Sequence, residues 1–265
     1  MADGVLKKRG KFAWHMENDI VFLVKTLKKE YLQSTLEGKL FFSCPDTFIS
    51  TGNNLASGQQ DIYDSHLNFM AHHLVVAPII KEDENGIQYG KGMKIADSAY
   101  MHRINETSRH SPMICFRKVD VSDIKVVDEC KIFALGNLVD RIKAEMGHDA
   151  FIIILAPLAF HKRLNEKERF FGRSIHYGEI DGQFQRFLDE HPSEQKEMFQ
   201  KRTEYAWQKE YRIALSPREE TSPLIVDIGS IEDIAIGGDI EMLRDGIVIA
   251  ETEEQLQKCS YFTHK

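Results

Sequence analysis

The sequence lacks the short motifs that mark the commonest enzyme classes. It contains no G-x-x-x-x-G-K-[ST] loop, no G-x-G-x-x-G after an expected strand, no G-x-S-x-G elbow and no H-E-x-x-H pair. Each motif supplies one piece of chemistry: a phosphate cradle, a dinucleotide turn, an exposed serine nucleophile or a zinc site. Their absence argues against P-loop, Rossmann, serine-hydrolase and zincin proteins of the usual kind.

Cysteine is also scarce. The four cysteines, Cys44, Cys115, Cys130 and Cys259, are far apart, and none forms a C-x-x-C pair or a zinc-finger spacing with histidine. Because structural zinc sites need such closely spaced ligands, we expect no metal cofactor. Reduced thiols in a cytoplasmic protein are the simplest interpretation.

Long apolar runs are missing too. No segment approaches the roughly 18–20 apolar residues of a membrane span, and the basic N-terminal residues are not followed by the apolar stretch of a signal peptide. We therefore expect a soluble, cytoplasmic protein with no membrane partner. The 41 acidic and 34 basic residues give a net charge of -7, which disfavours a surface built mainly for nucleic-acid phosphates.

Hydrophobic periodicity predicts a mixed chain. Strands are expected at 11–16, 39–43, 112–116, 150–155, 174–178, 209–215, 223–228 and 233–236, and helices at 18–36, 61–76, 131–147, within 181–205 and at 240–244. Residues 49–60 form the most loop-like segment, and residues 81–92 are expected to form an exposed hairpin tip. Without regular βαβ alternation, this order favours one α+β domain over residues 1–265, with a mainly antiparallel, split β-sheet flanked by helices.

The stretch WQKEYRI, residues 207–213, alternates like a strand that places a carboxylate and a guanidinium on one face. Glu210 and Arg212 share that face, while Tyr211 and Ile213 share the other. A solvated ion pair would explain the arrangement, and so would a catalytic carboxylate with an orienting cation. His15 and Ser43 are further polar residues in otherwise apolar strands, and each alone is more often a core histidine or a strand end.

Four segments together resemble a widespread, largely uncharacterised family of bacterial and phage proteins. They are GKLFFSCPDTF (38–48), SPMICF (111–116), WQKEYRI (207–213) and IGSIEDIAIGG (228–238). Family members read G-x-L-x-F-S-x-P-x-x-F, a strand ending Cys-Phe, W-x-x-E-x-E-[WY]-R-[IV] and a closing strand ending in Gly. This chain departs from the pattern at residues 49–54, where members carry Asn-Asp-Pro, and at Gln208, where they carry a first glutamate. It also lacks the W-x-x-Y-A-x-x-H segment that many members carry.

The layout is also remotely similar to the ADP-ribosyltransferase superfamily. In that fold a first strand presents a His or Arg, a second strand presents an aromatic residue or Ser, and a late strand presents a Glu. The resemblance assigns these positions to His15, to Phe42 with Ser43, and to Glu210, and it implies NAD as substrate. The expected catalytic residues are therefore Glu210, His15 and Ser43.

NAD chemistry gives each residue type a role. A carboxylate at Glu210 would stabilise the oxocarbenium-like cation that forms when the nicotinamide–ribose bond breaks. Phe42 or Tyr63 would stack on the nicotinamide ring, and His15 would hold a ribose hydroxyl. The remaining cofactor-binding candidates, which would neutralise the pyrophosphate, are Arg212, Arg117 and Lys39.

Three functions follow as hypotheses. The first is an ADP-ribosyltransferase or NAD glycohydrolase acting on a nucleic acid or protein, in a toxin or phage-defence setting that includes an antitoxin or defence-system partner. The second is a non-catalytic binding or inhibitor protein on the same scaffold. The third is a metal-dependent nuclease, for which Asp46, Asp61 and Asp64 are the acidic candidates. Convergence of His15, Ser43 and Glu210 on one cleft would distinguish the first two.

The first hypothesis also makes a structural claim. It places the face shared by Glu210 and Arg212 at the floor of a ligand cleft, roofed by the loop 49–60. A substitution at such an exposed position would abolish NAD turnover and change stability by no more than about 1 kcal/mol.

Overall fold

The structure is a computed structural model, and it describes residues 20–50, 66–83, 86–104, 106–127, 130–179 and 196–250. The expected strand at 11–16 with His15, almost all of the loop 49–60, and Tyr63 lie outside the described residues. Most of the segment 181–205 lies outside them as well.

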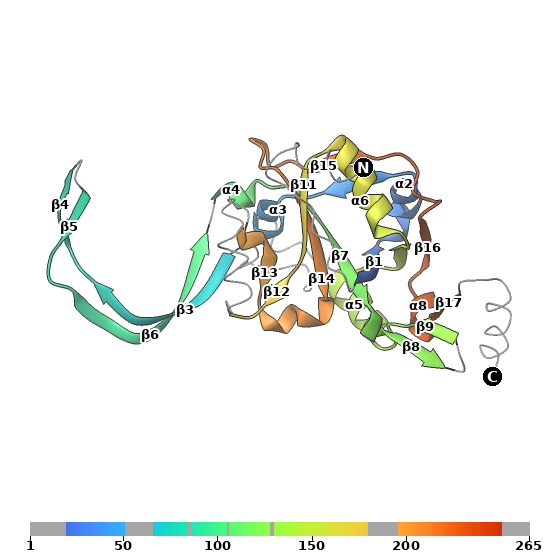
Figure 1. The fold of residues 1–265 in the computed structure, drawn as a ribbon, viewed down its shortest axis with the longest axis horizontal. Coiled ribbons are helices and arrows are strands. Elements are labelled where there is room, and N and C mark those ends of the chain that lie inside the picture. The colour runs from blue at the N-terminus through green and yellow to red at the C-terminus, as the bar shows by residue number, and fades with distance from the viewer. Residues whose placement is uncertain are drawn as a thin grey trace, which may run out of the picture.

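A six-stranded antiparallel sheet forms the centre of the body (Figure 1). Its strands, in spatial order, are β11 (Phe170–Ser174), β14 (Glu210–Leu215), β7 (Met113–Asp120), β1 (Ile20–Leu27), β10 (Ala150–Ile154) and β16 (Ala235–Asp239). Every neighbouring pair in it is antiparallel. The structure therefore confirms a mixed α+β chain with mainly antiparallel sheets.

Both faces of this sheet are covered by other elements. One face packs against α6 (Pro157–Lys167), α2 (Leu32–Leu36), β2 (Lys39–Phe42) and its partner β15 (Leu224–Asp227). The other face packs against α5 (Leu138–Met146), α8 (Met242–Asp245) and a small sheet of β8 (Ile124–Val127), β9 (Cys130–Phe133) and β17 (Ile247–Ile249). All five residues of β10 are buried, as expected for a strand covered on both sides.

Gly38 sets the turn from α2 into β2. Its φ of +91° lies in the left-handed region, and a Cβ at this position would come within 1.8 Å of the Gly229 carbonyl oxygen. Only glycine tolerates both the conformation and the close approach. A glycine in this conformation is typical of the residue just beyond the C-terminus of a helix, here α2.

Two predicted helices are wrong over most of their length. Residues 20–27 of the predicted helix 18–36 form β1, and only Leu32–Leu36 is α-helical. Residues 66–76 of the predicted helix 61–76 form β3 (His66–Val76), which pairs with β6 (Met93–Ile104). In both segments the apolar residues also fit helical spacing, and the deciding factor is pairing with strands distant in sequence. The predicted helix 131–147 is confirmed only as α5, since β9 precedes it.

Several elements of the structure were not predicted as such. The helix α6 and the strand β6 have no counterpart in the expected elements, and the strand expected at 174–178 is only β12 (His176–Tyr177), which pairs in parallel with β13 (Gln200–Lys201). Within 181–205 the described residues form the 3-10 helix η4 (Lys196–Phe199) and the start of η5 (Thr203–Gln208). The other short elements are α3 (Pro45–Ser50), α4 (Glu106–Arg109), η1 (Lys29–Tyr31) and η3 (Val121–Asp123).

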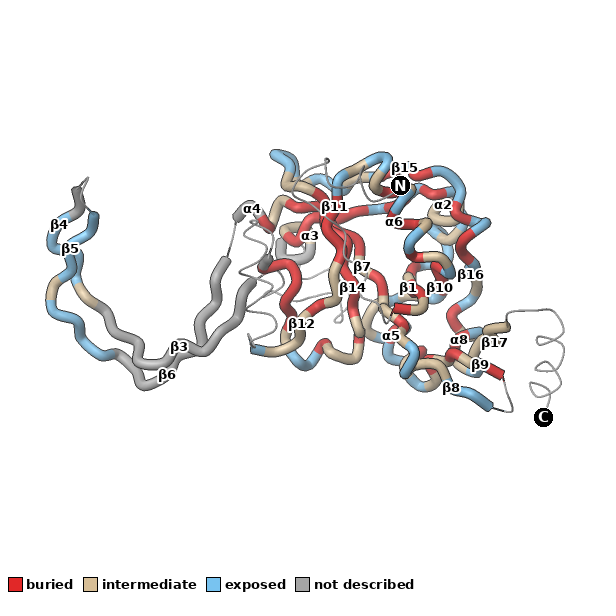
Figure 2. The backbone as a smooth tube through the Cα atoms, viewed as in Figure 1, coloured by how far each residue is buried: buried red, intermediate tan, exposed pale blue. Residues whose placement is uncertain are grey.

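A long two-stranded arm, residues 66–104, projects from the body (Figure 1). Its main part is the β3–β6 ribbon, and its far end is the hairpin of β4 (Ile79–Asp83) and β5 (Gly86–Tyr89). This hairpin confirms the predicted exposed tip at 81–92. Figure 2 shows the contrast between the exposed tip and the buried strands β7 and β14.

One cysteine differs from expectation. Cys44 and Cys115 are free, but Cys130 in β9 is disulfide-bonded. The prediction of four reduced thiols is therefore wrong for Cys130. Cysteine spacing alone could not reveal this bond, because a disulfide depends on proximity in the fold.

Burial of a histidine in the core predicts acid sensitivity. His161 in α6 is fully buried, and its ring lies 5.7 Å from the Tyr211 ring and 5.3 Å from the Phe170 ring. Burial lowers the pKa of His161 from 6.5 to about 4. As pH falls from about 6.5 to about 4, the unfolded chain binds this proton first, so stability should fall by about 1.4 kcal/mol per pH unit from this group.

The measurement is urea unfolding at several pH values, for the wild-type chain and for His161→Phe. Burial also lowers the pKa of His148, to about 3, so the variant should retain part of the slope. An identical slope in both proteins between pH 4 and 6.5 would contradict the assignment of this proton to His161.

Candidate functional site

The candidate site is a buried polar cluster of Lys201, Gln208, Glu210 and Arg212, here called the Glu210 cluster. Two of its members come from the start of β14, where Glu210 pairs with Arg117 and Arg212 with Cys115 on β7. The strand begins directly after Lys209, which ends η5 in a left-handed conformation with φ of 44°. That turn and the alternation of the strand place Glu210 and Arg212 on one face, as the sequence predicts.

The carboxylate of Glu210 bridges two cations. Arg212 approaches Oε1, with Nε at 2.7 Å and Nη2 at 2.6 Å. Lys201 in β13 donates from Nζ to Oε2 at 3.0 Å and also to Oε1 of Gln208 at 3.0 Å. Each carboxylate oxygen is therefore engaged by a different positive charge, as in the stronger charge-assisted hydrogen bonds of proteins.

These charges decide the protonation state of Glu210. Burial alone would raise the pKa of this carboxyl, but the positive charges of Arg212 and Lys201 outweigh the loss of water, and the pKa lies well below its usual range. The nearby Cys115 thiol lowers the pKa of Glu210 further. Glu210 is thus held as an anion.

Three neighbours share the environment of Glu210. Burial raises the pKa of Cys115 to about 12, and the negative charge of Glu210 adds to this effect. Tyr177 accepts a hydrogen bond from the Glu210 backbone N–H at 2.8 Å, and its own pKa is raised, mainly by burial. Burial lowers the pKa of Lys25 in β1, although Cys115 and Glu210 oppose that shift. Neither the thiol nor the phenol is poised to ionise near neutral pH.

The predicted exposure of this face is wrong. Glu210 is 5% exposed and Arg212 is fully buried, so the pair does not form the floor of an open cleft. The reason is that Phe171, Ile175, Met198 and Phe199 pack on this side of β14 as a further small core. The structure therefore also excludes the interpretation as a solvated ion pair.

The cluster connects β14 to the base of the arm. Arg212 donates from Nη1 to the backbone carbonyl of Met198 in η4 at 2.6 Å, and Lys201 lies in the following strand β13. Both η4 and β13 contact β3 of the arm. On the same side, Ser108 in α4, directly after β6, donates to the buried carboxylate of Glu197 at 3.1 Å. The ionic contacts therefore fix the segment 196–201 on which the arm rests.

The other predicted site residues do not gather around Glu210. Ser43 is buried and forms a β-bridge with Met113 of β7. Glu210 pairs with Arg117, which lies four positions further along β7. At about 3.4 Å per residue this separation is about 14 Å along the strand. Ser43 and Glu210 are thus not adjacent.

The predicted cofactor-binding residues also lie apart. Phe42 is fully buried in the core on the opposite face of the sheet, which leaves its ring no surface for a nicotinamide. Lys39 is exposed and pairs with Glu37 at 3.0 Å. Arg117 donates to the Trp207 carbonyl at 2.6 Å, which ties η5 to β7. His15 and Tyr63 lie outside the described residues.

The acidic residues of the nuclease hypothesis are only partly described. Asp46 pairs with Arg109, and Asp61 and Asp64 lie outside the described residues. Within the described ranges no group of three or more His, Cys, Asp or Glu side chains is arranged to hold a metal ion.

Sequence reasoning missed several members of the site. Lys201 stands in a polar stretch that resembles a helix, nine residues before Glu210, and no spacing rule connects the two. Cys115 was noticed only as a thiol, and Tyr177 only as part of a short strand. The late WQKEYRI motif was the one useful signal, because it identifies Glu210 and Arg212. It does not indicate which residues cover them.

Comparison with family models, with curated proteins and with solved structures finds no match for this chain. The resemblance to the phage and bacterial family and to ADP-ribosyltransferases therefore remains a prediction from the sequence. In the part of the chain that the structure describes, no helix is both long and apolar enough to cross a membrane.

The geometry predicts that Glu210 is a structural anchor. In Glu210→Gln, Arg212 and Lys201 would remain buried without a neutralising charge, which should lower the free energy of unfolding by about 3–5 kcal/mol. The measurement is urea unfolding. The matched control is Glu37→Gln, which removes the exposed partner of Lys39 and should leave the unfolding midpoint unchanged.

A double variant separates an unpaired charge from general damage. Glu210→Gln combined with Lys201→Met removes one of the two unneutralised cations, so it should lose less stability than the sum of the two single changes. Strict additivity, or a loss below about 1 kcal/mol for Glu210→Gln, would contradict the anchoring role.

Proposed function

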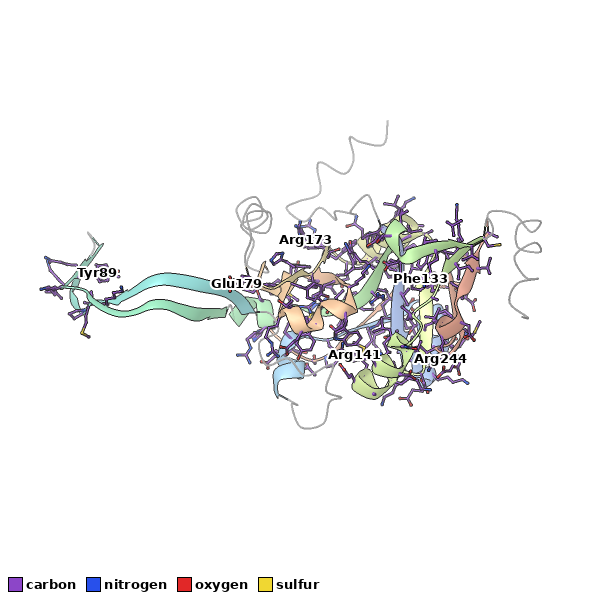
Figure 3. The ribbon with its side chains drawn as sticks, turned by 90° about the horizontal axis from the view of Figure 1, so that it is seen from below. Tyr89, Phe133, Arg141, Arg173, Glu179 and Arg244 are labelled. Carbon is purple, nitrogen blue, oxygen red and sulfur yellow. The ribbon has the colours of Figure 1, made fainter. Side chains whose placement is uncertain are left out.

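We propose that the chain is a non-catalytic binding protein whose α+β body holds the arm out towards a macromolecular partner. The observation that carries this proposal is the apolar tip of the arm. Five large apolar residues at residues 79–93 are between 43% and 69% exposed: Ile79, Ile80, Ile87, Tyr89 and Met93. Figure 3 shows Tyr89 at the far end of the arm, remote from the body.

The exposed tip is costly unless something covers it. Fully burying one large aliphatic side chain is worth about 1.5–3 kcal/mol, and a two-stranded hairpin is marginally stable by itself in water. Large exposed apolar patches mark sites of protein–protein or membrane interaction, or ligand-binding grooves. The anchoring of the arm base by the Glu210 cluster supports the same function, since it holds the arm in a fixed direction.

The second candidate is the NAD-consuming ADP-ribosyltransferase. What favours it is the ionised state of Glu210, because a carboxylate must be an anion to stabilise an oxocarbenium-like transition state. Burial of Glu210, and its distance from Ser43, favour the binding function instead.

Two variants with matched chemistry test the binding function. The tip variant is Ile80→Thr with Tyr89→Thr, whose residues are 65% and 61% exposed. The body variant is Phe41→Thr with Ile225→Thr, a cross-strand pair on β2 and β15 that is 56% and 63% exposed. Each variant replaces one isoleucine and one aromatic residue in a two-stranded sheet by threonine, which keeps β propensity.

The expected result is arm-dependent binding without turnover. The immobilised wild-type chain and the body variant should retain the same macromolecule, either another copy of the chain or a component of a cell extract, and the tip variant should lose it. None of the three should release nicotinamide from NAD, as measured by mass spectrometry. Nicotinamide release that disappears in Glu210→Asp would favour the second candidate, and equal retention by both variants would contradict the arm as binding element.

A further inference from the structure

We infer that the partner of the arm is a second copy of this chain, and that two arms lie side by side, antiparallel, about a two-fold axis. This inference rests on the proposed binding function and names its partner. It follows from the open edges of the arm, its charge and its length.

The first observation concerns the strand edges. Among the described strands, β3 and β6 form a sheet of only two members, so each has one edge whose backbone N–H and C=O groups face no further strand of that sheet. Such an edge is a template for pairing with another strand. Identical strands that run antiparallel about a two-fold axis are self-complementary, because each residue meets the same partner in both copies.

The second observation concerns charge. Residues 66–104 contain four basic and four acidic residues, so the whole net charge of -7 belongs to the rest of the chain. Two acidic bodies repel each other, whereas two neutral arms do not. The arm is therefore the part of the molecule through which two copies can meet at low electrostatic cost. A strongly basic partner, in contrast, would be attracted to the body.

The third observation concerns size. The 11 residues of β3 and the five of β4 have a path length of about 54 Å at about 3.4 Å per residue, along an arm that curves (Figure 1). A compact chain of 265 residues has a radius of gyration of only about 18 Å. Two arms can therefore overlap while the bodies stay apart. Residues 66–104 also exceed the roughly 20–30 residues that a stable interface takes from each partner.

The tip completes the interface. In an antiparallel pair of arms, each tip reaches towards the arm base of the other copy, and the exposed side chains of Ile80 and Tyr89 would be covered there. The ionic contacts of Lys201 and Arg212 hold the base from which each arm projects.

Sedimentation velocity on the full chain, from about 1 to about 100 µM, tests the inference. The wild type and the body variant should both be dimers at the upper concentrations. The tip variant should have a dimer dissociation constant raised at least about tenfold, with an unchanged circular dichroism spectrum. A wild-type chain that stays monomeric throughout, or a dimer weakened equally by both variants, would overturn the inference.

The same proteins distinguish this failure from failure of the proposed function. A monomeric wild type whose tip variant alone loses a component of the extract would overturn self-association and leave the arm as a binding element. A monomeric wild type that binds phosphatidylcholine vesicles through its tip would overturn self-association and identify a lipid surface as the partner of the arm. A monomer for which the tip variant changes no binding at all would overturn both proposals.

Discussion

The carboxylate of Glu210 is the contact on which the arrangement of the body and the arm depends. It lies between Arg212 on its own strand and Lys201 on β13, with all three groups withdrawn from water. Burying charges is costly, and the cost is offset only when every group finds well-placed partners. Here each oxygen of the carboxylate meets its own cation, and the two cations bind further acceptors at Met198 and Gln208.

A buried ion pair is a poor way to gain net stability, because apolar side chains of the same volume would often serve equally well. What the ion pair supplies is a fixed position of the segments that it joins, because hydrogen bonds to a carboxylate tolerate little displacement. The segment 196–201 also packs through Met198 and Phe199 in the small core beside β14, and apolar packing alone would allow it to slide. Ionic contacts fix its position, and with it the base of β3.

The sequence was informative where an element is defined by its own residues. The apolar strand at 150–154, the turn at Gly38 and the shared face of Glu210 and Arg212 all follow from local patterns. It was misleading for β1 and β3, because their apolar spacing fits a helix and their strand state comes from β7, β10 and β6. Local propensity cannot register partners that lie tens of residues away.

Burial of the candidate site was beyond prediction for the same reason. A strand with one polar and one apolar face normally exposes the polar face, and that rule placed Glu210 at the surface. In the structure, Phe171 in β11 and Met198 in η4 cover that face. Lys201, the counter-charge that makes burial tolerable, has no sequence relation to Glu210 that would identify it.

The same geometry favours a structural over a catalytic carboxylate. An ionised carboxylate offers about four lone-pair positions. Arg212 approaches Oε1 through two nitrogens and Lys201 approaches Oε2 through one, and Glu210 is only 5% exposed. A ribose hydroxyl would have to displace one of these donors, and displacing either cation would leave a buried charge without its partner. Because Arg212 and Lys201 also fix the segment 196–201, which contacts β3, a ligand at Glu210 would loosen the base of the arm.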